Sequence, residues 1–566
     1  GTYSIRAKVA DDQGDVREQA FTINAPIDPA QDSDGDGFPD VVEIAYGSDR
    51  FDPNSLANAA PVSLTLNGSS LAENQPIGAI VGEFNATDPD EGSALTITLI
   101  DGAGSTHNHL FATDDGNLRT AAAFDFEGLA GNNVFSIRTR LSDEYNASIA
   151  QTFTITVTDE PNEGNDPGAL RIAFTEGNSL STLDLNGSRI AVNHGSDAWI
   201  LRLEPGMAWL EHKLDTGLNT LYEVELAENL VAVSGAMQMD PMHWFTPLKT
   251  KLFRFESNGT LQALGEISSS AQYTPNTSIE LDGNFLAVGH FEMSRLALHQ
   301  VEVDGTLPQT AIEVGAYTLG TSVSLSGDLL ASGAPRAGAD GYSNVGLVNL
   351  FRGISTEGLD HYDEIEHPEP SNNALFGTSV SLSGNLLAIG APGDTTDGLP
   401  NAGSVYLYRI EAGAGPVKLA RLQASTPATE AFFGHSLELR DGLLLVGAPG
   451  EGLGAVHFFT IDGSGVASHS GQLTDPDGAG EEFGEFISLF GERSLIGNPG
   501  TGTAYLQNLP QALVLAGNGQ FQENLPVGSV VGQLQVISSG SSNFQFGLVA
   551  GTGDDDNSEF TLDGAN

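Results

Sequence analysis

Short apolar segments with alternating polar positions fill most of this chain, and turn-forming residues separate them at intervals typical of β-structure. In SVSLSGNLLAIGAP (379–392), Val380 and Leu382 alternate with serines, whereas residues 386–389 are continuously apolar. The first pattern is typical of a strand with one buried face, and the second of a strand buried on both faces. The chain is therefore predicted to be all-β.

This strand–turn–strand unit recurs between residues 169 and 511. The clearest copies cover 319–352, 376–409, 433–459 and 483–506, and weaker copies cover 181–203, 219–235 and 276–290. Aligned on the tight turn, the copies place at one position Gly187, Glu228, Gly283, Gly327, Gly384, Asp441 and Gly491. By subtraction, the steps between them are 41, 55, 44, 57, 57 and 50 residues. Seven units of this size, each with the order strand–turn–strand–loop–strand, predict a seven-bladed β-propeller, with a solenoid or a run of independent hairpins as the alternative.

The segments that flank the repeats have other patterns. Residues 1–26 are predicted to be the C-terminal hairpin of a truncated β-sandwich, 27–60 a linker, and 61–160 a complete β-sandwich. Residues 512–566 restart the sandwich pattern as a second, truncated module. We expect the chain to be an internal segment of a longer protein, because both ends interrupt such modules.

Charge and cysteine content narrow the range of functions that the chain could have. Lys and Arg total 22 against 74 Asp and Glu, so the formal net charge is -52. That balance excludes a general nucleic-acid binder, and it destabilises a compact state unless cations neutralise part of it. Cysteine is absent, which excludes disulfides and Cys-based zinc sites and leaves calcium as a stabilising element. No apolar run is long enough for a membrane span, so no direct membrane insertion is expected within this segment.

The acidic sequence DSDGDGFPDVVE (32–43) has the spacing of an EF-hand-like calcium loop. Calcium takes six to eight oxygen ligands, and this spacing supplies them at loop positions 1, 3, 5, 7, 9 and 12. The expected ligands are the side chains of Asp32, Asp34, Asp36, Asp40 and Glu43 and the carbonyl of Phe38. Gly37 occupies the sixth position, where the loop turns. The alternative is a solvated acidic turn.

Two of these segments resemble known calcium-binding modules. Because the Pro-containing residues 24–31 cannot form an entering helix, the loop together with GSDRFDPNS (47–55) resembles the thrombospondin type 3-like calcium linker of bacteria. Residues 61–160 resemble a cadherin repeat through AEN (72–74), DPDEG (88–92), DFE (125–127), SDE (142–144) and TDEPNE (158–163). The last motif matches the family's linker only in part, and the neighbouring modules are of other types.

The cadherin resemblance implies calcium at both ends of the sandwich. Carried over by position, the C-terminal cluster would comprise Glu73, Asp125, Glu127 and Asp159, and the N-terminal cluster Asp88, Asp90 and Asp143. The alternative is a set of surface turns on a sandwich that binds no metal.

The repeats themselves resemble the FG-GAP repeats of integrin α-subunits. FGTSVSLSGNLLAIGAP (376–392) carries the match most clearly, and the last four copies are stronger than the first three. The resemblance implies a platform that binds a ligand or serves as a structural element.

These observations predict a calcium-dependent adhesion or recognition protein at a bacterial cell surface, secreted or anchored. Its Ca²⁺-rigidified modules would present the propeller to a protein or glycan on another cell or in the matrix, a homophilic partner included. No catalytic motif is present, so an enzyme is not expected. The alternatives are a propeller enzyme, such as a polysaccharide hydrolase or lyase, and a pure scaffold. Asp, Glu, His or Arg converging at the propeller axis would favour the enzyme.

Overall fold

A computed structural model of the chain describes most of it. The described residues are 2–10, 16–24, 28–55, 57–90, 92–160, 169–174, 180–237, 246–271, 277–290, 294–302, 305–314, 319–339, 341–355, 358–411, 413–478, 482–509, 512–516 and 533–537. Apart from one α-helix and a single 3-10 turn, all regular structure in these ranges consists of β-strands. The all-β prediction is thus confirmed. No helix in these ranges has the length and apolar character of a membrane span.

The chain divides into two compact units, which we describe separately. Unit 1 comprises residues 1–70, 80–119 and 134–155, and unit 2 comprises residues 71–79, 120–133 and 156–566. Of the segment 512–566, the structure describes the paired strands β40 (Ala512–Ala516) and β41 (Gln533–Ile537). The rest of that segment, and linker residues 161–168, lie outside the described residues.

Unit 1 begins with an antiparallel hairpin, followed by the acidic loop and a short helix. The hairpin pairs β1 (Thr2–Ala10) with β2 (Val16–Asn24), and the helix is α1 (Asp40–Tyr46). No helix precedes the loop in the described ranges 2–10, 16–24 and 28–31, in line with the Pro-containing sequence. Helix α1 ends at Gly47, which has a φ of 81° and donates its N–H to the carbonyl of Glu43.

Two four-stranded sheets follow α1 in the chain. One has the order β3 (Ser63–Asn67), β5 (Ile80–Thr87), β8 (Asn117–Thr120) and β7 (Phe111–Asp114). The other has the order β4 (Ser70–Ala72), β11 (Ser148–Thr158), β10 (Val134–Ser142) and β6 (Thr96–Leu99). Buried residues alternate with others along β10, as expected of a strand with one face in a core.

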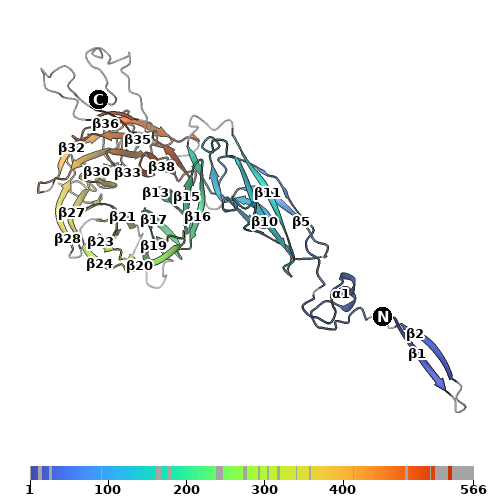
Figure 1. Ribbon diagram of the computed structural model, residues 1–566. Helices are drawn as coiled ribbons and strands as arrows, with labels where there is room; N and C mark the ends of the chain where they lie inside the picture. Colours follow the sequence, from blue (N-terminus) through green and yellow to red (C-terminus); the bar gives the residue numbers. More distant parts are fainter. Residues whose placement is uncertain are drawn as a thin grey trace. The chain divides into compact units, whose positions relative to one another are not determined.

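The ring in the described part of unit 2 contains seven antiparallel sheets, which we number in chain order (Figure 1). Six have four strands, and the first has a fifth strand, β9 (Ala122–Phe124), which pairs with β16. The first two are β13 (Leu180–Asn186), β14 (Arg189–His194), β15 (Asp197–Glu204), β16 (Met207–Leu214), and β17 (Thr220–Ala227), β18 (Leu230–Ala236), β19 (Thr246–Phe255), β20 (Leu261–Ala271). The next two are β21 (Thr277–Asp282), β22 (Phe285–His290), β23 (Arg295–Gln300), β24 (Gln309–Val314), and β25 (Ser322–Ser326), β26 (Leu329–Ala334), β27 (Leu347–Ser355), β28 (Gly358–Glu366).

The last three sheets follow the same order. Sheets 5 and 6 are β29 (Val380–Ser383), β30 (Leu386–Ala391), β31 (Ser404–Arg409), β32 (Val417–Leu422), and β33 (Leu437–Arg440), β34 (Leu443–Ala448), β35 (Ala455–Ile461), β36 (Ala467–Thr474). Sheet 7 is β37 (Phe486–Phe490), β38 (Arg493–Asn498), β39 (Thr503–Asn508) and β12 (Leu170–Ile172). Each repeat thus has a fourth strand beyond the three that the sequence predicts.

The seven sheets form a closed, propeller-like ring. The first strand of each sheet contacts the first strand of the next, and β37 contacts β13 to complete the circle. In Figure 1, β13, β17, β21 and β33 lie toward the middle and β16, β20, β24 and β28 at the rim. The closing strand β12 precedes the first repeat in sequence and pairs with β39, Leu170 opposite Leu506. The ring therefore joins the two ends of the repeat region directly.

The hydrophobic core of the ring lies between neighbouring sheets. Each of the seven junctions contains one cluster of buried side chains. The cluster between sheets 5 and 6, for example, includes Ala388, Leu407, Leu439 and Val446. The second strands, such as β34, are buried along their whole length. This accounts for the continuously apolar pattern of those segments.

The FG and GAP elements of the repeats meet across the junctions. A Cβ on Gly390 would collide with the carbonyl oxygen of Gly434 in the next sheet, and a Cβ on Gly447 would collide with that of Gly484. The glycines therefore permit a close backbone approach that holds neighbouring sheets together.

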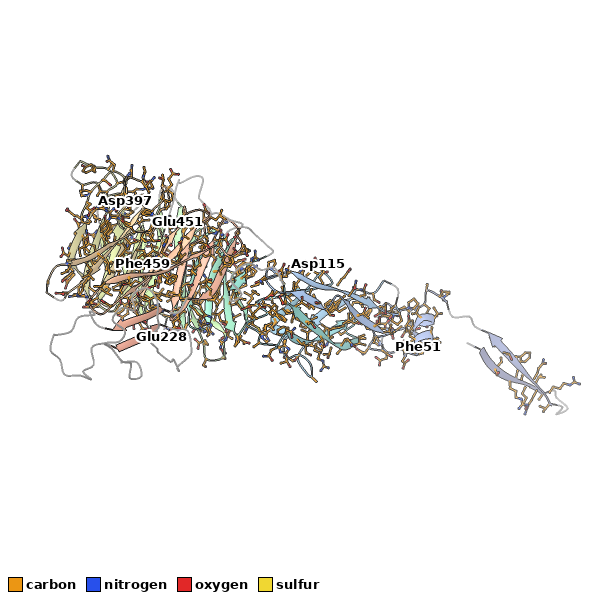
Figure 2. The ribbon with its side chains drawn as sticks, turned by 90° about the horizontal axis from the view of Figure 1, so that it is seen from above. Phe51, Asp115, Glu228, Asp397, Glu451 and Phe459 are labelled. Atoms are coloured by element: carbon orange, nitrogen blue, oxygen red, sulfur yellow. The ribbon has the colours of Figure 1, made fainter. Side chains whose placement is uncertain are left out.

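The seven aligned turn residues all have positive φ, between 41° and 62°, which confirms the sequence alignment of the repeats. Glu228, labelled in Figure 2, has a φ of 41° in the turn between β17 and β18. A side chain in this conformation costs about 1–2 kcal/mol, whereas glycine adopts it freely. We therefore expect Glu228→Gly to stabilise the ring by about 1 kcal/mol, measured as a higher melting temperature of the full chain.

The reciprocal change gives the matched control. Gly384 has a φ of 59°, and a Cβ there would meet no atom within 4 Å. Gly384→Ala should therefore lower stability by about 1 kcal/mol through the backbone alone. If both substitutions shifted the melting temperature in the same direction, the result would contradict the alignment of these two turns.

Candidate functional site

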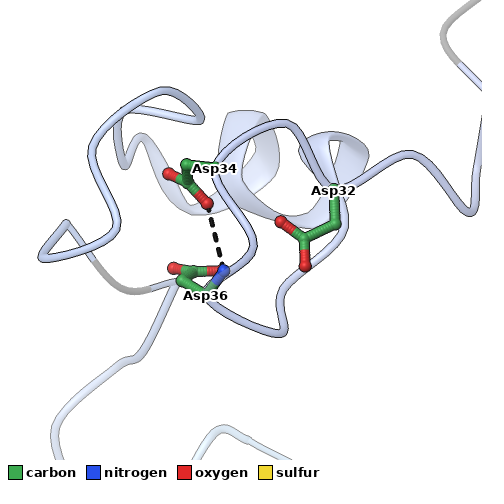
Figure 3. A group of neighbouring side chains, drawn as sticks. All are labelled: Asp32, Asp34 and Asp36. Atoms are coloured by element: carbon green, nitrogen blue, oxygen red, sulfur yellow. Dashed lines mark hydrogen bonds between the residues drawn. The ribbon is translucent and has the colours of Figure 1, made fainter.

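The loop 32–43 brings its first three acids together (Figure 3). One carboxylate oxygen from each of Asp32, Asp34 and Asp36 lies within 4.8 Å of the others. Asp32 accepts N–H bonds from Gly35 (2.7 Å) and Gly37 (3.1 Å), and these bonds hold the loop curved. The bond from Gly35 is the largest cause of the lowered pKa of Asp32. The loop is thus closed around a small, strongly negative space.

Glu43, in the first turn of α1, lies near these aspartates, although its oxygens do not belong to the group within 4.8 Å. Its side chain is fully buried, and neither of its carboxylate oxygens has a hydrogen-bond partner among the described residues. One oxygen each of Asp34 and Asp36 is also buried without a partner. Burial, reinforced by the charges of Asp34 and Asp36, raises the pKa of Glu43, and burial raises that of Asp34. A hard divalent cation matches this set of carboxylates, because it would neutralise their charge and bind the three converging aspartate oxygens.

The other two predicted ligands of the loop lie at its closing end. Asp40 is fully buried and accepts bonds from the backbone and hydroxyl of Ser33, both at 2.8 Å, while Arg50 approaches it at 3.5 Å. The carboxylate of Asp40 therefore links the closing end of the loop to Ser33 near its beginning. The ring of Phe38 lies 5.3 Å from the ring of Tyr145, so the loop also packs against the sandwich in unit 1.

The predicted N-terminal cluster of the sandwich is bound by side chains and backbone of the linker. Asp90 accepts bonds from the hydroxyl of Tyr46 in α1 and from the backbone N–H of Ala59 (2.8 Å). Asp143 accepts a 2.8 Å bond from the amide of Asn58. Asp88 accepts the N–H of Asp90, and its second oxygen is buried without a partner among the described residues. Asp90 and Asp143 therefore anchor the linker, and the metal-binding role of all three acids stays a prediction.

Three of the four acids in the predicted C-terminal cluster do converge. Glu73, Asp125 and Glu127 each offer an oxygen within 4.8 Å of the others. Asp159 is exposed and does not join this group. Fully buried Glu73 accepts N–H bonds from Phe126 (2.5 Å) and Glu160 (2.9 Å). Because these bonds already satisfy both oxygens of Glu73, this cluster fits a cation less well than the loop does.

A polar cavity of about 610 Å³ runs along the middle of the ring, lined by residues from the first strands of all seven sheets. We refer to it as the axial cavity. Its wall contains the carboxylates Glu223, Glu225, Glu280, Asp282, Glu438 and Glu485, the basic side chains His435 and Arg440, and many serines and threonines. The sequence analysis did not single out any of these residues. The signal was available in the repeat alignment, three residues before each turn.

The residue at that aligned position lines the axial cavity in five of the seven sheets. The occupants of the position are Asp184, Glu225, Glu280, Ser324, Ser381, Glu438 and Ser488. Four of them accept a backbone N–H from the next sheet, and these bonds join Leu226 to Asp184 (2.7 Å), Leu382 to Ser324 (3.0 Å), Leu439 to Ser381 (2.9 Å) and Leu185 to Ser488 (3.0 Å). The polar residues that alternate along the first strands thus tie neighbouring sheets together.

The glutamates of the axial cavity bind protons tightly. Burial raises the pKa of Glu223 and of Glu438 to about 8; the charge of Asp184 adds to the effect, and Arg440 opposes it at Glu438. Burial also raises the pKa of Glu225 and Glu280 well above the ordinary value. These four groups all shift in the same direction, and Asp282 and Glu485 are the other acids in the wall.

Comparison with known proteins supports the propeller-like character of the ring. A family model described as FG-GAP repeat matches residues 367–408. None of the curated proteins matches the chain. Since FG-GAP repeats are typical of extracellular proteins, the match indicates a propeller-like domain of the extracellular, adhesion type.

Several solved structures are similar to part of this chain at low sequence identity. One is a candidate 6-phosphogluconolactonase of Bacteroides uniformis, 13% identical, with a TM-score of 0.40 over 60% of this chain and 92% of that one. A protein from Lactobacillus plantarum is 12% identical, with a TM-score of 0.40 over 61% and 94%. A second candidate 6-phosphogluconolactonase, from Bacteroides fragilis, is 13% identical, with a TM-score of 0.40 over 61% and 92%.

The raised pKa values make the stability of the ring depend on pH. Folded Glu223 and Glu438 keep their protons up to about pH 8, whereas unfolded glutamates lose theirs near pH 4.5. Between these values the folded state holds more protons, so stability should fall as pH rises. Glu438→Gln should remove on the order of 2 kcal/mol of this pH dependence, measured by thermal unfolding between pH 5 and pH 8.

Glu364→Gln, at an exposed position of β28, is the matched control and should leave the pH profile unchanged. A wild-type stability that is constant or rises over this range would contradict the protonation of the axial glutamates.

Proposed function

We propose that this chain is a calcium-dependent surface-recognition protein in which Ca²⁺ bound by the loop 32–43 rigidifies a row of β modules that present a seven-bladed β-propeller. The modules are the hairpin 1–26 from a truncated sandwich, the calcium linker 27–60, a cadherin-like sandwich 61–160, the propeller 169–511 and the start of another sandwich 512–566. The FG-GAP match and the closed ring of seven sheets support the propeller assignment.

One observation carries the calcium assignment. Glu43 is fully buried with both carboxylate oxygens unpartnered, beside three aspartates whose oxygens converge. Leaving a buried carboxylate without a counter-charge is strongly unfavourable, and no Lys or Arg of the described residues forms an ion pair with it. Asp32, Asp34, Asp36 and Glu43 would hold the ion, with the carbonyl of Phe38 as the next candidate. Bound calcium would neutralise these charges.

The contacts of α1 explain how a bound ion would stiffen unit 1. Glu43 and Tyr46 belong to the same short helix, so a ligand that fixes Glu43 also fixes Tyr46. The hydroxyl of Tyr46 donates to Asp90, and Phe38 packs against Tyr145. Calcium would in this way lock the linker onto the sandwich. A stiff row of modules loses less conformational entropy when it binds a partner.

The partner would be a protein or glycan on another cell or in the matrix, and the protein would act outside the cell. A propeller enzyme is the second candidate, because acids do line the axial cavity. A hydrolase needs one ionised and one protonated carboxyl group, however, and the four glutamates all have raised pKa values. We therefore favour recognition over catalysis.

Calcium titration by calorimetry tests the proposal on the full chain after treatment with a chelator. Wild-type protein should bind calcium at a site that Glu43→Gln weakens at least tenfold, which is about 1.4 kcal/mol. At a free calcium concentration a hundred times the Kd, the ion should stabilise unit 1 by about 2.7 kcal/mol, detected as a higher melting temperature.

Glu83→Gln makes the same charge change at an exposed position of β5 and should not alter the affinity. The proposal fails if the loop variant binds calcium as tightly as wild type, or if the chelator leaves the melting temperature of unit 1 unchanged.

A further inference from the structure

Two histidines and a glutamate lie together on sheet 6 of the ring, and none of them lines the axial cavity. His457 belongs to the third strand β35, His469 belongs to the fourth strand β36, and Glu451, labelled in Figure 2, follows β34. The side chain of His457 is fully buried and that of Glu451 is 16% exposed, whereas His469 is exposed. The group therefore reaches from the interior of the sheet to its surface.

Glu451 determines which nitrogen of His457 carries the proton. One carboxylate oxygen of Glu451 lies 2.8 Å from Nε2 of His457, and the other accepts a 2.8 Å bond from the amide of Gln472. Burial opposes ionisation of Glu451, but the bond from His457 holds its pKa below the usual value. An ionised carboxylate only accepts hydrogen bonds, so Nε2 of His457 is the protonated nitrogen. In the neutral ring, Nδ1 therefore presents a lone pair.

The two histidines are placed as a pair of metal ligands would be. Nδ1 of His457 lies 3.2 Å from Nε2 of His469. Zinc lies about 2.0–2.1 Å from a histidine nitrogen, so an ion bound to both atoms would see them at about 103°, close to the tetrahedral angle. The N–H of His469 occupies the lone pair of His457 in the observed conformation, and a turn of the exposed ring would exchange that bond for a metal ion.

The surroundings of the two rings favour such an exchange. The ring of Phe433 packs edge-on against His457, with the ring centres 5.2 Å apart, and helps to hold the buried ligand in place. A carboxylate bonded to the second nitrogen of a histidine ligand fixes the ring and its tautomer, and Glu451 does this for His457. Burial, and then the charge of His457, lower the pKa of His469, so this ring is neutral and able to bind a metal at pH 7.

Sheet 5 carries fixed positive charges at the equivalent positions. The strand pairings match Asp394 with Glu451, Tyr406 with His457, Lys418 with His469 and Arg421 with Gln472. In sheet 5, Arg421 donates to Asp394 (3.3 Å), and Nζ of Lys418 lies 5.1 Å from the ring centre of Tyr406. Sheet 6 has a histidine and a glutamine in place of these two cations, and a bound metal ion would supply the missing positive charge beside its acid.

We propose that His457 and His469 bind a transition-metal ion such as Zn²⁺, with Glu451 as a positioning residue. Nδ1 of His457 and Nε2 of His469 would be the protein ligands, and water would complete the coordination. Imidazole nitrogens suit zinc and copper, whereas calcium takes oxygen ligands, so this site and the loop 32–43 would bind different ions. The site goes beyond the proposed function and does not depend on it.

Calorimetric titration of the full chain with Zn²⁺ at pH 7, in excess calcium to occupy sites made of oxygen ligands, tests the proposal. Wild-type protein should bind Zn²⁺ at a site that His469→Lys, which copies Lys418 of sheet 5, weakens at least tenfold. Glu451→Gln should weaken binding about 10- to 100-fold, because it removes the carboxylate that orients His457.

His361→Asn is the matched control. His361 occupies in sheet 4 the position that His469 has in sheet 6, but its Nε2 faces Oδ1 of Asn349 (3.4 Å) rather than a second histidine. This substitution should leave the zinc affinity unchanged. The thermal transition of each variant establishes that the ring is folded, and His469→Lys should melt close to wild type because sheet 5 accommodates lysine at this position.

Electron paramagnetic resonance with Cu²⁺, which prefers the same ligands, identifies the donor atoms. Wild type should show coupling to two nitrogens, and His469→Lys should lose this signal. The proposal is overturned if wild type does not bind Zn²⁺, if folded His469→Lys binds it as tightly as wild type, or if the bound copper has oxygen ligands alone. Zinc binding that survives Glu43→Gln would keep this site even if the calcium proposal failed.

Discussion

A buried carboxylate without a counter-charge is the constraint that connects the parts of this protein. With 22 basic residues against 74 acids, the chain cannot pair its acids internally. It nevertheless buries Glu43 beside the aspartates of the loop and places Glu225, Glu280 and Glu438 inside the ring. Only protonation or an external cation removes that penalty. The loop offers three converging aspartates that suit a metal ion, whereas the described acids in the wall of the axial cavity do not include three that converge in this way.

The ring itself is held by polar groups as much as by its apolar junctions. At four of the seven junctions, a side chain three residues before the turn accepts an N–H from the next sheet. Glycine pairs such as Gly390 and Gly434 bring the backbones of neighbouring sheets together. The closing strand β12 then ties the beginning of the ring to its end. The ring is therefore closed by backbone pairing and by hydrogen bonds between sheets.

Much of this arrangement could be predicted from the sequence. The repeat alignment located all seven turns, since each aligned residue has positive φ, including the non-glycine residues Glu228 and Asp441. The spacing of the acids in 32–43 predicted that Asp32, Asp34 and Asp36 would lie together, as they do in the structure. The fourth strands were missed because they lie at the rim without a regular apolar pattern, as β36 illustrates. The pairing of Leu170 with Leu506 could not be predicted, because the two strands are far apart in the chain and nothing in the local sequence of either indicates the other. Nor could sequence reveal that linker groups would occupy Asp90 and Asp143.

Anomalous X-ray diffraction from crystals grown with calcium tests the central claim most directly, because it locates the ion itself. The account predicts a peak inside the loop 32–43, about 2.3–2.6 Å from oxygens of the aspartates and of Glu43. The same loop conformation with no peak, and with water or a protein group filling the space beside Glu43, would contradict it.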